Sequence, residues 1–101
     1  MSSYLYRLTL RRELLGRPMT PDEAATQKKH LYYLTAARDQ GIVLAAGRTD
    51  EPAERTFGLV LFNADSDATA QDFMANDPAI AGKLMDAELF PFRLAVPQKE
   101  K

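Results

Sequence analysis

The sequence contains no cysteine and only one histidine, His30. Without cysteine there can be no disulfide, no thiolate metal site and no cysteine nucleophile. A zinc site built from protein ligands alone is not expected with one histidine and no cysteine. Haem chemistry would need His30 as the axial ligand, and no other residue supports it. We therefore expect neither a metal nor an organic cofactor.

The sequence also lacks an excess of either charge and lacks long apolar runs. The formal net charge is −1 at pH 7, which leaves no basic footprint for nucleic acid. No apolar stretch approaches the roughly 20 residues that span a bilayer. The first residues, Met1-Ser2-Ser3-Tyr4, do not place a basic region before an apolar run, so we expect no secretory signal. These absences predict a cytoplasmic protein without nucleic-acid or membrane partners.

The length and composition are those of an ordinary globular chain. Its 101 residues are 46% hydrophobic and 27% charged, enough for one modest core. We expect a single domain over residues 1–101. Its packed part should cover residues 4–96, with a charged, frayed tail at 97–101.

Apolar alternation predicts strands at 4–10, 56–62 and 88–96. A short apolar run at 42–47 lacks alternation, and we expect it to form a central strand covered on both faces. Pro91 cannot donate to a neighbouring strand, which predicts an edge position or a bulge there.

Helix signals separate these strands. Thr20, Pro21 and Glu23 form the pattern of a capping box, and Gly41 is a typical stop, so a helix is expected from about Pro21 to Gln40. A second helix should run from about residue 67 to 76. Apolar spacing then indicates a short helix that includes Ile80, Leu84 and Met85.

The predicted order is β-α-β-β-α-β, the ferredoxin-like α+β plan with an antiparallel sheet and helices on one face. The other sheet face would be bare, although its strands carry apolar residues on both sides. An open apolar face on a small domain is usually covered. We expect a second copy of the chain to pack on it, sheet to sheet, as a symmetric homodimer.

The stretch Asn76-Asp77-Pro78-Ala79-Ile80-Ala81-Gly82 contains the carboxylate most suited to work with His30. A helix cannot easily pass through Asp-Pro, so Asp77 is placed to cap a new short helix. Alternatively, the carboxylate faces a pocket and orients a base. His30 lies about 40° around the helix from Leu34, at the edge of the expected buried face. It is either a helix-edge histidine with a satisfied hydrogen bond or a base.

Other side chains have two interpretations each. Arg7 and Arg48 can hold an enolate, a carboxylate or a leaving chloride, or they can be solvated or salt-bridged arginines. The tyrosines can stack on a ring, or they can pack in the core and at an interface; they are Tyr4, Tyr6, Tyr32 and Tyr33.

Taken together, the spaced features resemble the YciI-like (YCII-related) family of small dimeric α+β barrel proteins, from Tyr4 to Val96. They are His30 on the first helix, the glycine-bracketed stretch 41–47, the Asp-Pro stretch 76–82 and Phe90-Pro91-Phe92. The resemblance implies a His30–Asp77 pair in a cleft near the barrel. Activities known in and near the family are dehydrochlorination of a chlorinated hydroxyhydroquinone and isomerisation of muconolactone. Arg48 and Ala79 depart from the family's usual proline and aromatic residue, so the substrate does not carry over.

We therefore expect a small cofactor-independent enzyme, a dehydrochlorinase-like lyase or an isomerase, that uses His30 and Asp77 on a small cyclic or aromatic substrate. Arg7 and Arg48 would bind the substrate. The alternative is a dimeric protein without catalysis that binds a small ligand or assists another protein.

Overall fold

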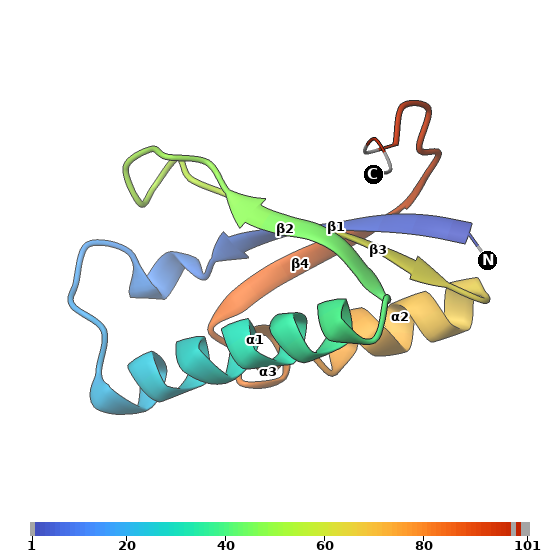
Figure 1. The fold of residues 1–101 in the computed structure, drawn as a ribbon. Coiled ribbons are helices and arrows are strands. Elements are labelled where there is room, and N and C mark those ends of the chain that lie inside the picture. The colour runs from blue at the N-terminus through green and yellow to red at the C-terminus, as the bar shows by residue number, and fades with distance from the viewer. Residues whose placement is uncertain (1, 98, 100–101) are drawn as a thin grey trace.

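The computed structural model describes residues 2–97 and 99, which fold into a single sheet with helices on one face (Figure 1). The elements are β1 (Ser2–Leu10), a short 3₁₀ turn η1 (Arg12–Leu14), α1 (Pro21–Asp39), β2 (Val43–Arg48), β3 (Gly58–Ala64), α2 (Asp67–Ala75), α3 (Pro78–Ala81) and β4 (Met85–Phe92). The strand order is β2-β3-β1-β4, and every neighbouring pair is antiparallel. The predicted ferredoxin-like plan is confirmed.

The core lies between the sheet and the helices. Alternation along β1 turns Tyr4, Tyr6 and Leu8 into this layer, where each is at most 5% exposed. Phe62 of β3 and Phe73 of α2 meet there with ring centroids 4.7 Å apart, and Tyr6 packs edge-on against Phe62 at 5.6 Å. The inward face of β1 is therefore held in an aromatic cluster.

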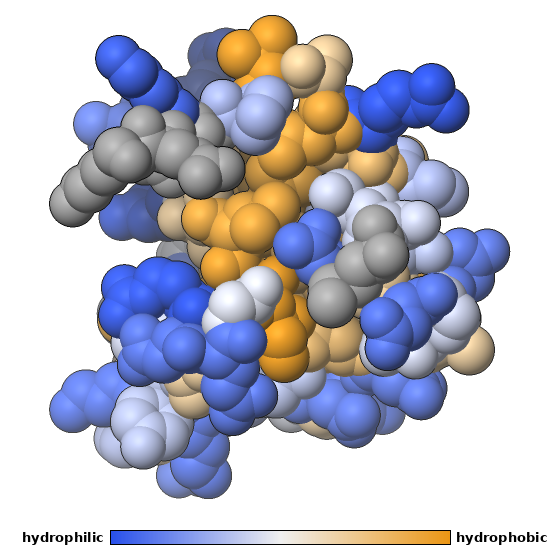
Figure 2. Space-filling view, turned by 45° about the vertical axis from the view of Figure 1, so that its right-hand side comes forward, coloured by the Kyte–Doolittle hydropathy of each residue, from blue (hydrophilic) through white to orange (hydrophobic). Residues whose placement is uncertain are grey.

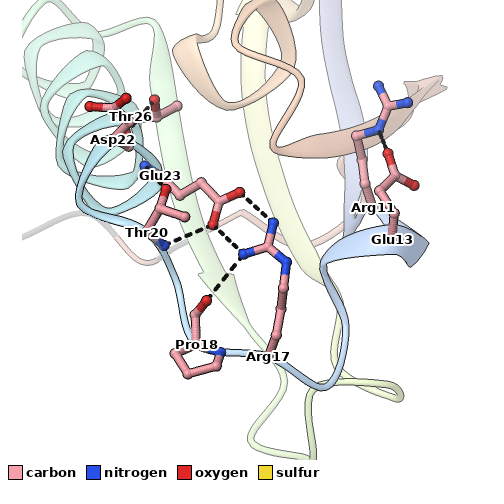
Figure 3. Close-up of polar contacts among 8 residues, drawn as sticks. All are labelled: Arg11, Glu13, Arg17, Pro18, Thr20, Asp22, Glu23 and Thr26. Carbon is pink, nitrogen blue, oxygen red and sulfur yellow. Dashed lines mark hydrogen bonds and ion pairs between the residues drawn. The ribbon is translucent and has the colours of Figure 1, made fainter.

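The beginning of α1, the helix that contains His30, is fixed by polar contacts (Figure 3). Thr20 and Glu23 form the predicted capping box, and Arg17 binds both carboxylate oxygens of Glu23 at 2.9 and 2.7 Å. The hydrogen bond from Arg17, reinforced by the backbone N–H of Thr20, lowers the pKa of Glu23 to about 2. The helix ends as expected, with Gly41 in the left-handed region at φ +81°.

One strand prediction is wrong. The stretch 42–47 was expected to be central and covered on both faces, yet β2 lies at the edge of the sheet and pairs only with β3. After Val43 its residues are exposed. The large side chains of this run, Ile42, Val43 and Leu44, stand together at its beginning, and the small residues 45–47 do not indicate its place in a sheet.

The C-terminal region differs from its prediction in two ways. The short helix ends at Ala81, and Met85 already belongs to β4, because Lys83 takes up a left-handed backbone at φ 60°. The last strand ends at Phe92 rather than Val96. Pro91 does lie on an edge strand, as predicted. Most of the expected tail falls outside the described residues.

No helix in the described part of the chain combines the length and apolar character needed to cross a membrane.

Candidate functional site

Asp77 begins the short helix α3 and is completely buried, with 0% exposure. Pro78 stands at the first helical position, where its missing N–H is not needed. The Oδ1 atom of Asp77 accepts the backbone N–H of Ala79 at 2.9 Å. The predicted helix cap is therefore present.

The same Oδ1 atom also lies 2.6 Å from Nδ1 of His30, which sits on α1 and is 8% exposed. The helix cap and the contact with His30 are both present, whereas the fully buried carboxylate does not face a pocket, contrary to the second interpretation. One oxygen serves the two because a carboxylate oxygen has more than one lone pair. Residues 47 positions apart in the sequence thus meet inside the fold.

A third group was not singled out by the sequence. The hydroxyl of Tyr6, on β1, donates to Oδ2 of Asp77 at 2.7 Å, and the Tyr6 side chain is fully buried. Burial, together with the nearby charge of Asp77, raises the pKa of Tyr6 far above its ordinary value, so the phenol stays protonated. The sequence predicts the strand that contains Tyr6 but leaves open whether Tyr6 packs in the core or stacks on a ring, and no sequence pattern links it to Asp77.

The partners of Asp77 set the proton positions. Ala79 and Tyr6 both donate hydrogen bonds to the carboxylate, which is the pattern expected of an ionised acid. In the neutral ring, a hydrogen bond donated by Nδ1 to Asp77 leaves the lone pair on Nε2. No described residue makes a hydrogen bond to Nε2. The imidazole of His30 is thus held on one side by a buried carboxylate.

Helices α1 and α3 approach each other closely beside the pair. A methyl group added at Gly82 would lie 2.8 Å from the carbonyl oxygen of Pro78 and 3.1 Å from Cγ2 of Thr26. Thr26 is one turn before His30 on α1. The contact with Thr26 shows that α1 and α3 leave little room for a side chain beside Gly82.

A shallow hollow of about 520 Å³ adjoins the pair. Its lining residues are Lys28, Lys29, Tyr32, Tyr33 and Pro78. Pro78 follows Asp77 directly, and Tyr33 lies one helical turn after His30, although neither member of the pair lines the hollow. Burial, and to a lesser extent the charge of Asp77, raises the pKa of Tyr33 to about 12. The wall of the hollow is thus formed by neutral tyrosine and proline, together with the two lysines.

The two arginines lie elsewhere. Arg7 alternates with Tyr6 along β1 and projects from the opposite, open sheet face, where its guanidinium sits 4.7 Å above the ring of Phe57. Arg48 lines a second hollow of about 510 Å³ on that face, with Phe57 and Leu5 among its neighbours. Within one chain the structure therefore does not bring Arg7 or Arg48 to the His30–Asp77 pair.

Within residues 2–97 and 99, no three potential metal-ligating side chains of the His, Cys, Asp or Glu type come together. The cluster consists of one imidazole, one carboxylate and one phenol joined by hydrogen bonds.

Comparison with known proteins gives a family and a fold. The family model described as the YCII-related domain matches residues 10–93. The 5-chloro-2-hydroxyhydroquinone dehydrochlorinase TftG of Burkholderia phenoliruptrix AC1100 superposes with a TM-score of 0.66 at 17% identity, over 90% of this chain and 93% of its own. A muconolactone isomerase superposes with a TM-score of 0.70 at 15% identity, over 98% of this chain and 97% of its own. Among curated proteins no match was found. At these identities the two superpositions establish a shared fold.

Substitution of Asp77 tests how much the stability of the fold depends on the hydrogen bonds that Asp77 accepts. Asp77→Ala leaves three buried donors unpaired, and we expect it to lower the free energy of unfolding by about 3–5 kcal/mol. Asp77→Asn keeps the side-chain shape and one acceptor for the cap, so its cost should be clearly smaller. Urea unfolding followed by far-UV circular dichroism measures both. A cost for Asp77→Ala of only about 1 kcal/mol, as for an ordinary helix cap, would contradict the network.

Proposed function

From the membership of this chain in the YCII-related domain family, we propose that it is a small enzyme without a cofactor that moves protons on a small cyclic or aromatic substrate. His30 is the base, and Asp77 orients it. The single observation that supports this most is the 2.6 Å contact between Nδ1 of His30 and the buried carboxylate of Asp77. It leaves Nε2 available for a substrate proton.

The favoured reaction is loss of HCl from a chlorinated hydroxyhydroquinone, by analogy with TftG. Removal of a hydroxyl proton by His30 pushes electrons into the ring, which takes up a proton at the carbon that carries chlorine. Loss of a second hydroxyl proton then forms the quinone as the C–Cl bond breaks and chloride leaves. The net change is the loss of HCl, so no oxidant is needed. Proton transfer between two carbons of a lactone would use the same base.

A polar atom near the base supports a hydroxylated substrate. The Oε1 atom of Gln27 is buried and accepts no hydrogen bond from the described residues. Gln27 lies one helical turn before His30, so the two side chains emerge on neighbouring parts of α1. An unpaired buried acceptor costs free energy, and a substrate hydroxyl that donates to Gln27 would recover it.

We place the substrate's ring at the hollow bordered by Lys28, Lys29 and Tyr33. Tyrosine and proline walls suit a flat ring, and the lysines favour a substrate with phenolate character. Arg7 and Arg48 remain candidates for holding an anion in the other hollow, on the open sheet face, apart from the proton transfer.

A second candidate function is binding without catalysis, as a dimeric ligand-binding or accessory protein. It is favoured by one specific observation: neither hollow is lined by His30 or Asp77. A ligand held in either hollow would need to extend beyond it to meet the imidazole.

We also propose that a second copy of the chain covers the open sheet face. Strand pairing aligns Leu5 with Leu61 on β3 and with Phe90 on β4, and their neighbours Leu59 and Phe92 are 38% and 39% exposed. Figure 2 shows a continuous band of apolar side chains between hydrophilic ones on the side of the molecule that it draws. Two such faces packed in a symmetric dimer would remove this apolar surface from water.

Chloride release tests the enzymatic proposal. Wild type, His30→Gln and Asp77→Asn would be incubated with a chlorinated hydroxyhydroquinone. Loss of the base or of its orienting charge should reduce kcat by about 10²–10⁴-fold, while circular dichroism shows an unchanged fold. The His30–Asp77 assignment is wrong if wild type releases chloride and both variants match it. If wild type releases none, this substrate is excluded and the binding function becomes the better account.

The dimer has a separate test with a matched control. Leu59→Lys puts a charge on the open sheet face and should convert a species of twice 11.3 kDa into one of 11.3 kDa. Leu31→Lys makes the same change on the exposed side of α1, where Leu31 is 64% exposed, and should leave the mass unchanged. Sedimentation equilibrium gives the mass. A wild-type chain that stays monomeric at high micromolar concentration would refute the proposal.

A further inference from the structure

Three elements hold one buried carboxylate. The imidazole of His30 comes from α1, the Ala79 N–H from α3 and the Tyr6 hydroxyl from β1, at 2.6, 2.9 and 2.7 Å. Two of these contacts fall on Oδ1, and among described residues only Tyr6 contacts Oδ2. The phenol therefore decides whether the carboxylate can turn about its terminal bond.

We propose that Tyr6 is a positioning residue for proton transfer. Tyr6 acts on the base through Asp77. This role of Tyr6 rests on the proposed roles of His30 and Asp77. By holding Oδ2, Tyr6 keeps Oδ1 aimed at Nδ1 of His30 and so keeps Nε2 directed at the substrate. Tyr6 makes no contact with the reacting atoms.

The surroundings suit Tyr6 to this role. Its side chain is fully buried and packs edge-on against Phe62 and Phe73, so the ring has no freedom to swing away. Its raised pKa keeps the hydroxyl a donor throughout the physiological range. A donor that can neither move nor ionise gives the carboxylate one fixed orientation.

The competing explanation is that Tyr6 only links β1 to the beginning of α3 through its hydrogen bond. Loss of such a link would lower the stability of the fold but would not alter the hydrogen bond of the imidazole. The chain contains a matched control for this explanation. Tyr4, two residues earlier on the same strand face, donates to Oδ1 of Asp67 at 2.6 Å, and no hydrogen bond among the described residues connects Asp67 to His30.

The experiment compares Tyr6→Phe with Tyr4→Phe, since each removes one hydroxyl from a tyrosine–aspartate contact. The observable is exchange with water of the Nδ1–H proton of His30, measured by NMR in ¹⁵N-labelled protein. His30 is the sole histidine, so the signal needs no further assignment. Tyr6→Phe should speed this exchange about tenfold, the ratio expected from one lost hydrogen bond to a charged group. Tyr4→Phe should leave it unchanged.

Equal exchange rates in wild type and Tyr6→Phe would overturn the proposal, as would equal acceleration by both variants. If Tyr6→Phe does not fold in plain buffer, the three proteins are compared in a buffer that contains sucrose, which favours the folded state, and the same two results overturn the proposal. None of these measurements needs a substrate. A failure of chloride release with an intact Tyr6 effect would therefore exclude this substrate, favour the binding function and leave the role of Tyr6 in orienting His30 in place.

Discussion

A carboxylate removed from water must find donors for both oxygens, and the site of this protein depends on how Asp77 does so. Its three donors come from β1, α1 and α3, which are far apart in the chain. Helices α1 and α3, which supply two of these donors, lie close together at Gly82, where Thr26 of α1 is the neighbour. Removing any donor leaves part of a buried charge unpaired, which is costly in a low-dielectric interior. The stability of the fold and the geometry of the base thus rest on the same contacts.

The sheet separates the proposed proton-transfer site from the surface proposed to bind a second copy of the chain. His30, Asp77 and Tyr6 lie on the side covered by helices, while the apolar side chains proposed to bind a second copy lie on the other. Strict alternation along β1 causes this separation, because Tyr6 and Arg7 are adjacent in sequence yet point to opposite faces. Residues of the proposed proton-transfer pair and residues of the proposed dimer surface can therefore change independently.

Much of this arrangement could be predicted from sequence because its signals are local. The capping box at Thr20 and the Asp-Pro break at Asp77 depend on near neighbours, and alternation identified the strand that contains Tyr6. The contact of Tyr6 with Asp77 could not be predicted, since it joins residues 71 positions apart and any tyrosine on that face would look the same. Arg7 and Arg48 have guanidinium groups that can hold an anion. The alternation of side chains along each strand decides which sheet face these groups reach. The position of β2 at the edge of the sheet is likewise set by strand pairing, and the small side chains of its second half do not indicate that pairing.

The central claim is that Asp77 fixes the protonation of His30 so that Nε2 is the free base. The ¹⁵N chemical shifts of the His30 ring, recorded at neutral pH on the uniformly labelled protein, test this most directly. The account predicts a protonated Nδ1 and an unprotonated Nε2 in the neutral ring. A neutral ring with its proton on Nε2 would contradict it, because Nδ1 would then have no proton to donate to Asp77 and Nε2 no lone pair for a substrate.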